Sequence, residues 1–75
     1  MRAYMFINAT QGQALTLTRS IRELPGVQLA DPITGDYDIV AGVTAKDLAE
    51  LRTVMTGVQA LPGILKTTTC MVLAD

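Results

Sequence analysis

A short motif that occurs twice constrains the fold more than any other feature of the sequence. Leu24-Pro25-Gly26-Val27 lies in the first half of the chain, and Leu61-Pro62-Gly63-Ile64 lies in the second. Proline cannot continue the hydrogen bonds of a helix, and glycine adopts the positive φ that often ends one. Each copy therefore predicts the end of a helix and, through its β-branched fourth residue, the start of a strand.

Apolar residues at helical spacing precede each copy of the motif. They lie on one stripe in residues 11–24 and one in residues 45–60: Ala14, Leu17, Ile21 and Leu24, then Leu48, Leu51, Met55 and Val58. Steps of three and four residues are typical of an amphipathic helix. Thr10 and Gln13 have the spacing of a capping box. Thr44 and Asp47 have it too, so we expect a Thr hydroxyl to bind an amide at the start of each helix.

Four segments that favour strands flank the helices: residues 3–7, 27–33, 37–43 and 64–73. Thr34-Gly35-Asp36 predicts a turn that joins the middle two as a hairpin. Pro32 has no amide to donate, so its strand should lie at a sheet edge or end there. The order βαββαβ with right-handed crossovers predicts an α+β, ferredoxin-like sandwich. Its antiparallel four-stranded sheet has order 4-1-3-2, with both helices on one face.

The length of the chain limits how it can be stabilised. With 75 residues, residues 1–75 form a single domain that buries only about 60–65% of its unfolded surface.

The single Cys70 cannot form an internal disulfide, and we expect it to be buried in its apolar strand rather than reactive. Without histidine there is no Ser-His or Cys-His pair and no common zinc set. We expect no catalytic residue, metal or cofactor, and oligomerisation remains as the source of stability.

The first predicted strand is apolar on both of its faces. Tyr4 and Phe6 alternate with Ala3, Met5 and Ile7. A sheet that helices cover on one face would then expose an apolar patch on the other, which on a small protein indicates a partner surface. We expect a homo-oligomer whose dimers form through the sheet faces; the alternative is a few tolerated surface apolar residues.

The charge pattern argues against two classes of partner. Six basic and seven acidic residues give a net charge of −1, and the bases are scattered. We therefore expect no direct DNA binding. The longest uncharged stretch, residues 3–18, includes several polar residues, so we expect no membrane span. A cytoplasmic location with a reduced thiol is the simplest interpretation.

Polar groups with binding chemistry concentrate at Thr34-Gly35-Asp36-Tyr37-Asp38. Backbone amides near Gly35 suit a small carboxylate, and an aspartate suits an ammonium group, so together they suit a free amino acid. The alternative is that these are simply good turn residues. The hydroxyls of Lys66-Thr67-Thr68-Thr69 give weaker support, with Thr67 and Thr69 as the candidates, since Thr is also an ordinary strand residue.

A resemblance to a known family rests on an ordered set of segments: residues 3–7, Leu24 to Val27, Thr34 to Val40, Leu48 with Leu51, and Leu61 to Ile64 followed by Thr67 to Thr69. The whole chain resembles the effector-binding (RAM) domain of the leucine-responsive/asparagine regulator (Lrp/AsnC) family. That resemblance implies a ferredoxin-like fold, dimers paired through their sheets, and octameric or decameric rings. It also implies that amino-acid effectors bind between dimers, lined by Thr34, Gly35, Asp36, Tyr37 and Asp38, with Thr67 and Thr69 as weaker candidates.

Full-length family members carry an N-terminal helix-turn-helix domain, whereas this sequence resembles the stand-alone form of the module. We therefore expect a non-enzymatic sensor of an amino acid or related metabolite that modulates transcription regulators, such as a full-length family member, or metabolic partners. One alternative is a small dimeric α+β barrel enzyme of the cofactor-independent monooxygenase kind, which would need a roomy cavity between sheet and helices. Another is a purely structural oligomerisation module.

Overall fold

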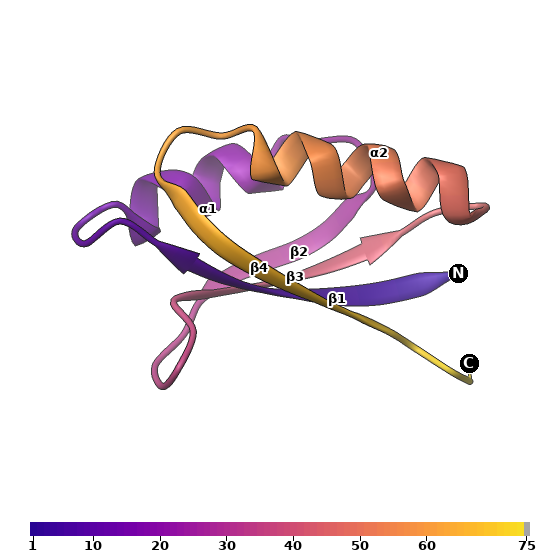
Figure 1. The fold of residues 1–75 in the computed structure, drawn as a ribbon, viewed down its shortest axis with the longest axis horizontal. Helices are drawn as coiled ribbons and strands as arrows, with labels where there is room; N and C mark the ends of the chain where they lie inside the picture. Colours follow the sequence, from indigo (N-terminus) through magenta and orange to yellow (C-terminus); the bar gives the residue numbers. More distant parts are fainter. Residues whose placement is uncertain (75) are drawn as a thin grey trace.

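The computed structural model describes residues 1–74 and shows one antiparallel sheet with two helices on one face (Figure 1). The elements follow one another as β1 (Arg2–Ala9), α1 (Ala14–Arg22), β2 (Val27–Pro32), β3 (Ile39–Thr44), α2 (Leu48–Gln59) and β4 (Ile64–Met71). The strands lie in the order β2-β3-β1-β4, which is the expected order read from the other edge. The predicted ferredoxin-like α+β fold is confirmed.

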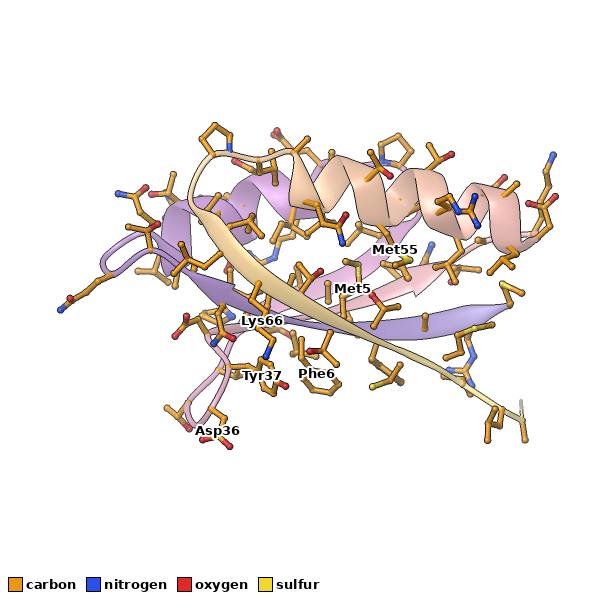
Figure 2. All side chains as sticks on the ribbon, viewed as in Figure 1. Met5, Phe6, Asp36, Tyr37, Met55 and Lys66 are labelled. Carbon is orange, nitrogen blue, oxygen red and sulfur yellow. The ribbon has the colours of Figure 1, made fainter. Side chains whose placement is uncertain are left out.

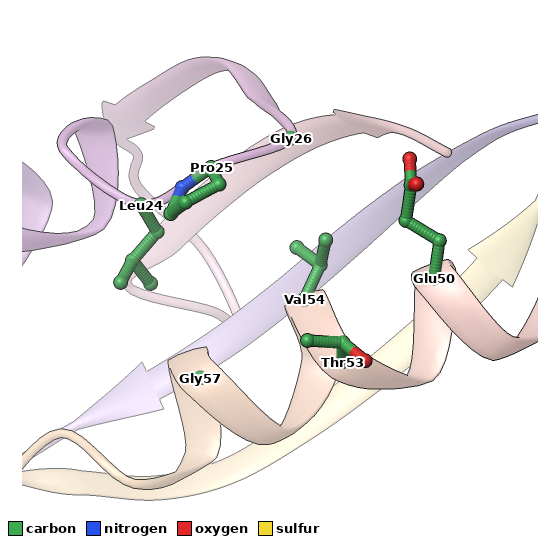
Figure 3. A pocket seen from close by; sticks show the side chains of 7 residues that line it. All are labelled: Leu24, Pro25, Gly26, Glu50, Thr53, Val54 and Gly57. Carbon is green, nitrogen blue, oxygen red and sulfur yellow. The ribbon is translucent and has the colours of Figure 1, made fainter. Parts of the chain in front are cut away.

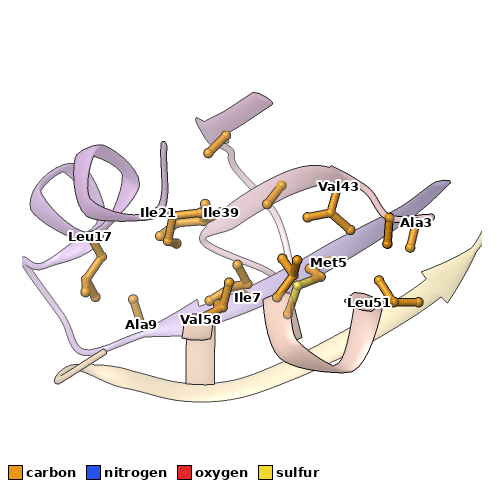
Figure 4. Close-up of a cluster of buried hydrophobic side chains, with 14 residues drawn as sticks. Ala3, Met5, Ile7, Ala9, Leu17, Ile21, Ile39, Val43, Leu51 and Val58 are labelled. Atoms are coloured by element: carbon orange, nitrogen blue, oxygen red, sulfur yellow. The ribbon is translucent and has the colours of Figure 1, made fainter. Parts of the chain in front are cut away.

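The central strand β1 fixes which residues form the core. It pairs with β3 and β4 on either side, so that Met5 lies between Ala41 and Thr69. Alternate residues of β1, from Ala3 through Met5 to Ile7, face the helices and are buried. They pack against Leu17 and Ile21 of α1 and Leu51, Val54 and Val58 of α2 (Figure 4). The expected stripe of α1 packs as predicted, whereas in α2 Leu51 and Val58 pack with Val54, which was not expected, and Leu48 is 54% exposed.

The predicted helix caps are wrong at both helices. α1 begins at Ala14 after Gln13, which makes no side-chain capping bond. The Thr10 hydroxyl donates instead to the Gly63 carbonyl, at 3.2 Å. At α2 the cap is Asp47, whose carboxylate accepts from the Glu50 amide at 2.8 Å. Asp47 is thus the N-cap residue of α2 rather than its third residue, and α2 begins at Leu48.

The amides of both threonines bind carbonyls of the repeat motifs. The Thr10 amide donates to the Gly63 carbonyl and the Thr44 amide to the Gly26 carbonyl, each at 2.8 Å. Gly26 and Gly63 have φ of +88° and +100°, so each repeat motif ends its helix as predicted. The carbonyl of each motif glycine then receives the amide of the threonine in the other half of the chain. The repeat therefore joins the two halves as well as ending the helices.

The β2 edge of the sheet is protected. Arg22 Nε donates to the Ala30 carbonyl at 2.8 Å, and Arg22 Nη2 lies 3.3 Å from Asp31 Oδ1. Pro32, also on this edge strand, has no amide to offer. The expectation that the strand of Pro32 lies at a sheet edge is confirmed.

Gly26 lies where a side chain has no room. A Cβ at Gly26 would lie 2.7 Å from Val54 Cγ2 and 3.2 Å from the Thr44 carbonyl oxygen. We expect Gly26→Ala to lower the free energy of unfolding by about 2–4 kcal/mol, from left-handed strain and overpacking together. Gly12→Ala is the matched control: its φ is +81°, but no atom lies within 4 Å of its Cβ. It should cost only the backbone strain, about 1–2 kcal/mol. Equal losses in urea denaturation would contradict the close packing.

Candidate functional site

The turn between β2 and β3 projects from the side of the sheet that the helices leave uncovered (Figure 1). The Ile33 amide donates to the Asp38 carbonyl at 2.9 Å and closes the turn. Gly35 has φ of +109°, a conformation that favours glycine. Thr34, Gly35 and Asp36 are exposed. The strand after the turn begins at Ile39, later than the expected Tyr37.

Asp38 holds the turn to the end of β1. Its Oδ2 accepts from the Ala9 amide at 2.8 Å, and its own amide donates to the Ile7 carbonyl at 2.9 Å. The pairing of β1 with β4 shifts register between Asn8 and Ala9. The carboxylate of Asp38 thus binds a main-chain amide next to an irregularity in the sheet. Its first role is to place the turn.

Tyr37 joins the turn to the uncovered face of the sheet. Its ring centroid lies 5.5 Å from that of Phe6, at an interplanar angle of 48°. Its hydroxyl lies 3.4 Å from Thr68 Oγ1. In Figure 2 Phe6 and Tyr37 lie below the sheet, whereas Met5 and Met55 lie between the sheet and the helices. The aromatic pair therefore connects the exposed tip of the turn to the apolar part of the face.

Thr67 and Thr69 are not brought together with the turn. Across the β1–β4 pairing they lie opposite Ile7 and Met5, on the face that the helices cover. Thr67 Oγ1 accepts from Gln59 of α2 at 3.0 Å. Thr69 Oγ1 is buried without a hydrogen-bond partner among residues 1–74. As part of a ligand site they stay a prediction.

Asn8 was not predicted as a site residue, and Thr68 and Lys66 were part of the weakly supported run but not among its candidates. Thr68 pairs with Phe6 across the sheet, and Lys66 pairs with Asn8. Asn8 Nδ2 donates to the Asp36 carbonyl at 2.8 Å. The sequence signal that could have identified them is the alternation of side chains along β1. Residues of β4 that pair with Phe6 and Asn8 lie on the same face of the sheet as these two residues.

The uncovered side of the sheet, called the open face here, has an apolar centre. Its central members come from all four strands: Tyr4, Phe6, Leu29, Val40, Thr68 and Cys70. The polar Asn8 and Lys66 continue it at one end. Tyr4 and Leu29 remain 39% and 43% exposed. The prediction that both faces of the sheet are apolar is confirmed, and a patch of this kind marks a contact surface. Cys70 is exposed on this face, so the expectation that it is buried is wrong.

A cavity of about 350 Å³ lies between the first Leu-Pro-Gly loop and α2 (Figure 3). It is lined by Leu24, Pro25, Gly26, Glu50, Thr53, Val54 and Gly57. Glu50 Oε1 accepts from the Lys46 amide at 3.2 Å, so this carboxylate already takes part in the start of the helix. The cavity is apart from the turn, and none of the predicted site residues lines it.

Two further observations concern residues 1–74. No helix among them is long and apolar enough to cross a membrane. No cluster of three or more His, Cys, Asp or Glu residues in the same part of the chain has the arrangement of a metal site.

Comparison with known proteins agrees with the fold. The family model of the Lrp/AsnC ligand binding domain matches residues 2–75. TTHA0845 from Thermus thermophilus superposes with a TM-score of 0.92 and 33% identity, covering 99% of this chain and 94% of that one. The transcriptional regulator NMB0573 from Neisseria meningitidis, solved as a complex with L-Met, gives 0.85 at 18% identity; 99% of this chain matches 50% of that one.

Curated relatives include a much longer enzyme. Homocitrate synthase from Sulfurisphaera tokodaii is 40% identical over 57 residues, which are 76% of this chain. The match spans only 12% of that synthase. The similarity therefore concerns one segment of the enzyme.

The bond from Ala9 to Asp38 can be tested by removing its acceptor. We expect Asp38→Ala to lower the free energy of unfolding by about 1–3 kcal/mol, because the amide at the end of β1 loses its partner. Asp38→Asn keeps an acceptor and should cost less. Asp36→Ala, at an exposed position, should stay within about 0.5 kcal/mol of the parent. Equal effects at the two positions in thermal or urea denaturation would contradict the structural role of Asp38.

Proposed function

The chain belongs to the Lrp/AsnC ligand-binding domain family, and we propose that it is a non-enzymatic sensor that binds a small amino acid where subunits meet. The observation that carries the proposal is the contact of Tyr37 with Phe6 and Thr68, which sets the exposed turn against the open face. A ligand at this margin would touch the turn and an adjoining subunit together. Binding would then be coupled to assembly.

Pairing of open faces supplies the subunit contact in this proposal. A domain of 75 residues has a small core. Burial of its exposed Tyr4 and Leu29 side chains in a subunit contact would stabilise the assembly. A two-fold pairing of equivalent faces is the commonest way for such a patch to be covered. Rings of such dimers, octameric or decameric, are the further assembly that we propose from the family resemblance.

The chemistry of the turn favours an amino acid as the effector. Asp36 is exposed at the tip, while the carboxylate of Asp38 already accepts from Ala9. Asp36 is therefore the better partner for a ligand ammonium group, and the turn amides near Gly35 suit a carboxylate. That NMB0573 was solved with L-Met supports the same ligand class.

A sensor that modulates another protein also fits the relatives. A similar segment makes up only part of homocitrate synthase, which supports a module attached to different activities rather than one that performs them. We propose that the chain acts in the cytoplasm, without contacting DNA itself, on a full-length regulator or a metabolic partner. The monooxygenase alternative would need a polar group inside a cavity beneath the helices. A purely structural module remains the alternative if no ligand binds.

The assembly is tested at Phe6, which lies on the open face. We expect the parent chain to be dimeric or larger at micromolar concentration, and Phe6→Asp to shift it towards a folded monomer, because a carboxylate there would be buried unpaired. Leu15→Asp is the control: Leu15 is 65% exposed on α1, away from the open face. Sedimentation velocity with circular dichroism checks both. A monomeric parent chain would contradict the proposal.

Effector binding is tested by native mass spectrometry against the twenty amino acids, followed by calorimetry on those that bind. Asp36→Asn should cost about 2–5 kcal/mol of binding free energy, a loss of affinity of about thirtyfold or more. Glu23→Gln, which removes an exposed carboxylate after α1, should leave affinity unchanged. If the double variant Asp36→Asn with Asp38→Asn bound every amino acid as well as the parent does, the turn would have no role in effector binding.

A further inference from the structure

The cavity between the first Leu-Pro-Gly loop and α2 has walls that the fold holds in position. A Cβ at Gly26 would lie 2.7 Å from Val54 Cγ2, so the backbone of the loop packs directly against the helix at this point. The Gly26 carbonyl accepts from the Thr44 amide at 2.8 Å, which fixes the loop to the sheet. A cavity of about 350 Å³ is at the lower end of the range for small-molecule sites and has room for about ten non-hydrogen atoms.

A glycine inside α2 leaves space in the cavity. Figure 3 shows Leu24 of the loop on one side, and Val54 and Gly57 of α2 on the other. Gly57 lies three residues after Val54, on the same face of the helix. A Cβ at Gly57 would be 3.8 Å from the nearest atom, a side-chain carbon of Leu24, which is an ordinary contact distance. Glycine destabilises a helix relative to alanine, and packing does not require it here, so its effect is to enlarge the cavity.

The polar groups of the cavity are acceptors. Glu50 lies one helical turn before Val54, and its Oε1 accepts from the Lys46 amide at 3.2 Å. Its other carboxylate oxygen makes no hydrogen bond or ion pair with the described residues. The Thr53 hydroxyl donates to the Ala49 carbonyl at 3.2 Å, and its oxygen remains an acceptor. None of the residues that line the cavity is basic.

We propose that this cavity binds a small primary amine with an apolar body. The ammonium group contacts Glu50, and the apolar body lies between Leu24 and Gly57. A carboxylate binds an ammonium group more strongly than it binds a neutral donor, and burial of the hydrocarbon part adds to the affinity. A free amino acid is disfavoured, because its own carboxylate would approach Glu50 without a cation to bind it. The site is separate from the turn of the proposed function and does not depend on it.

The test uses isopentylamine as the probe, with two matched ligands. Isopentanol has the same apolar body without the charge, and leucine adds a carboxylate to the amine. Titrations of the isotope-labelled chain are followed by NMR through its backbone amide signals. We expect the amine to shift the signals of Leu24, Gly26 and residues 50–57. Isopentanol and leucine should bind at this place about fivefold more weakly or not at all.

Variants separate the charge from the space. Glu50→Gln keeps an acceptor for the Lys46 amide and should weaken the amine by about fivefold or more. Glu23→Gln removes an exposed carboxylate outside the cavity and should leave its affinity unchanged. Gly57→Met fills the cavity and should weaken the amine by about tenfold or more, whereas Thr56→Met, at an exposed position outside it, should not. Gly57→Ala should raise the midpoint of thermal unfolding by about 2–8 °C.

Three results would overturn the inference. One is equal binding of the amine by the parent chain and by Glu50→Gln. Another is a change in the cavity signals with protein concentration in the absence of the amine, because a second copy would then occupy the cavity. The third is leucine that shifts the signals of residues 34–38 while the amine shifts none at the cavity, and in that case the proposed function would stand. Binding of the amine without binding of any amino acid would contradict the proposed function alone.

Discussion

Two main-chain hydrogen bonds, from Thr10 to Gly63 and from Thr44 to Gly26, fix where each helix returns to the sheet. In each bond the acceptor is the carbonyl of a glycine with positive φ. The bonds join the ends of β1 and β3 to loops from the opposite half of the chain. β1 and β3 are the adjacent central strands of the sheet, so each bond holds a loop that leaves a helix against the end of a central strand.

The position of the β2–β3 turn depends on β1. Three consecutive residues of that strand bind it: the Ile7 carbonyl accepts from the Asp38 amide, the Asn8 side chain donates to the Asp36 carbonyl, and the Ala9 amide donates to the Asp38 carboxylate. A loop held at three successive points has little freedom to move away from the sheet. The candidate site is therefore a property of strand and turn together.

The fold was accessible from the sequence because its strongest signals are local. The repeated Pro-Gly stops and the apolar stripes of residues 11–24 and 45–60 each need only a few neighbours to act. The roles of Thr10 and Thr44 were not accessible, because both bind glycine carbonyls from the other half of the chain. The cap of α2 was accessible, because Asp47 and Glu50 have the spacing of a local cap. The faces of Thr67 and Lys66 depend on how β4 pairs with β1, including a register shift at Asn8 and Ala9. No spacing within residues 64–73 reveals that register.

The two edge strands of the sheet, β2 and β4, differ in how readily a strand of another molecule can pair with them. On the β2 side, Arg22 occupies the Ala30 carbonyl and Pro32 withholds a donor. A fibril that grows by strand addition needs both edge strands of every copy to be free to pair with another copy. With the β2 margin obstructed, strand addition along β4 ends once two copies have joined. The chain can thus present an apolar open face for assembly with a low tendency to polymerise through its sheet edges.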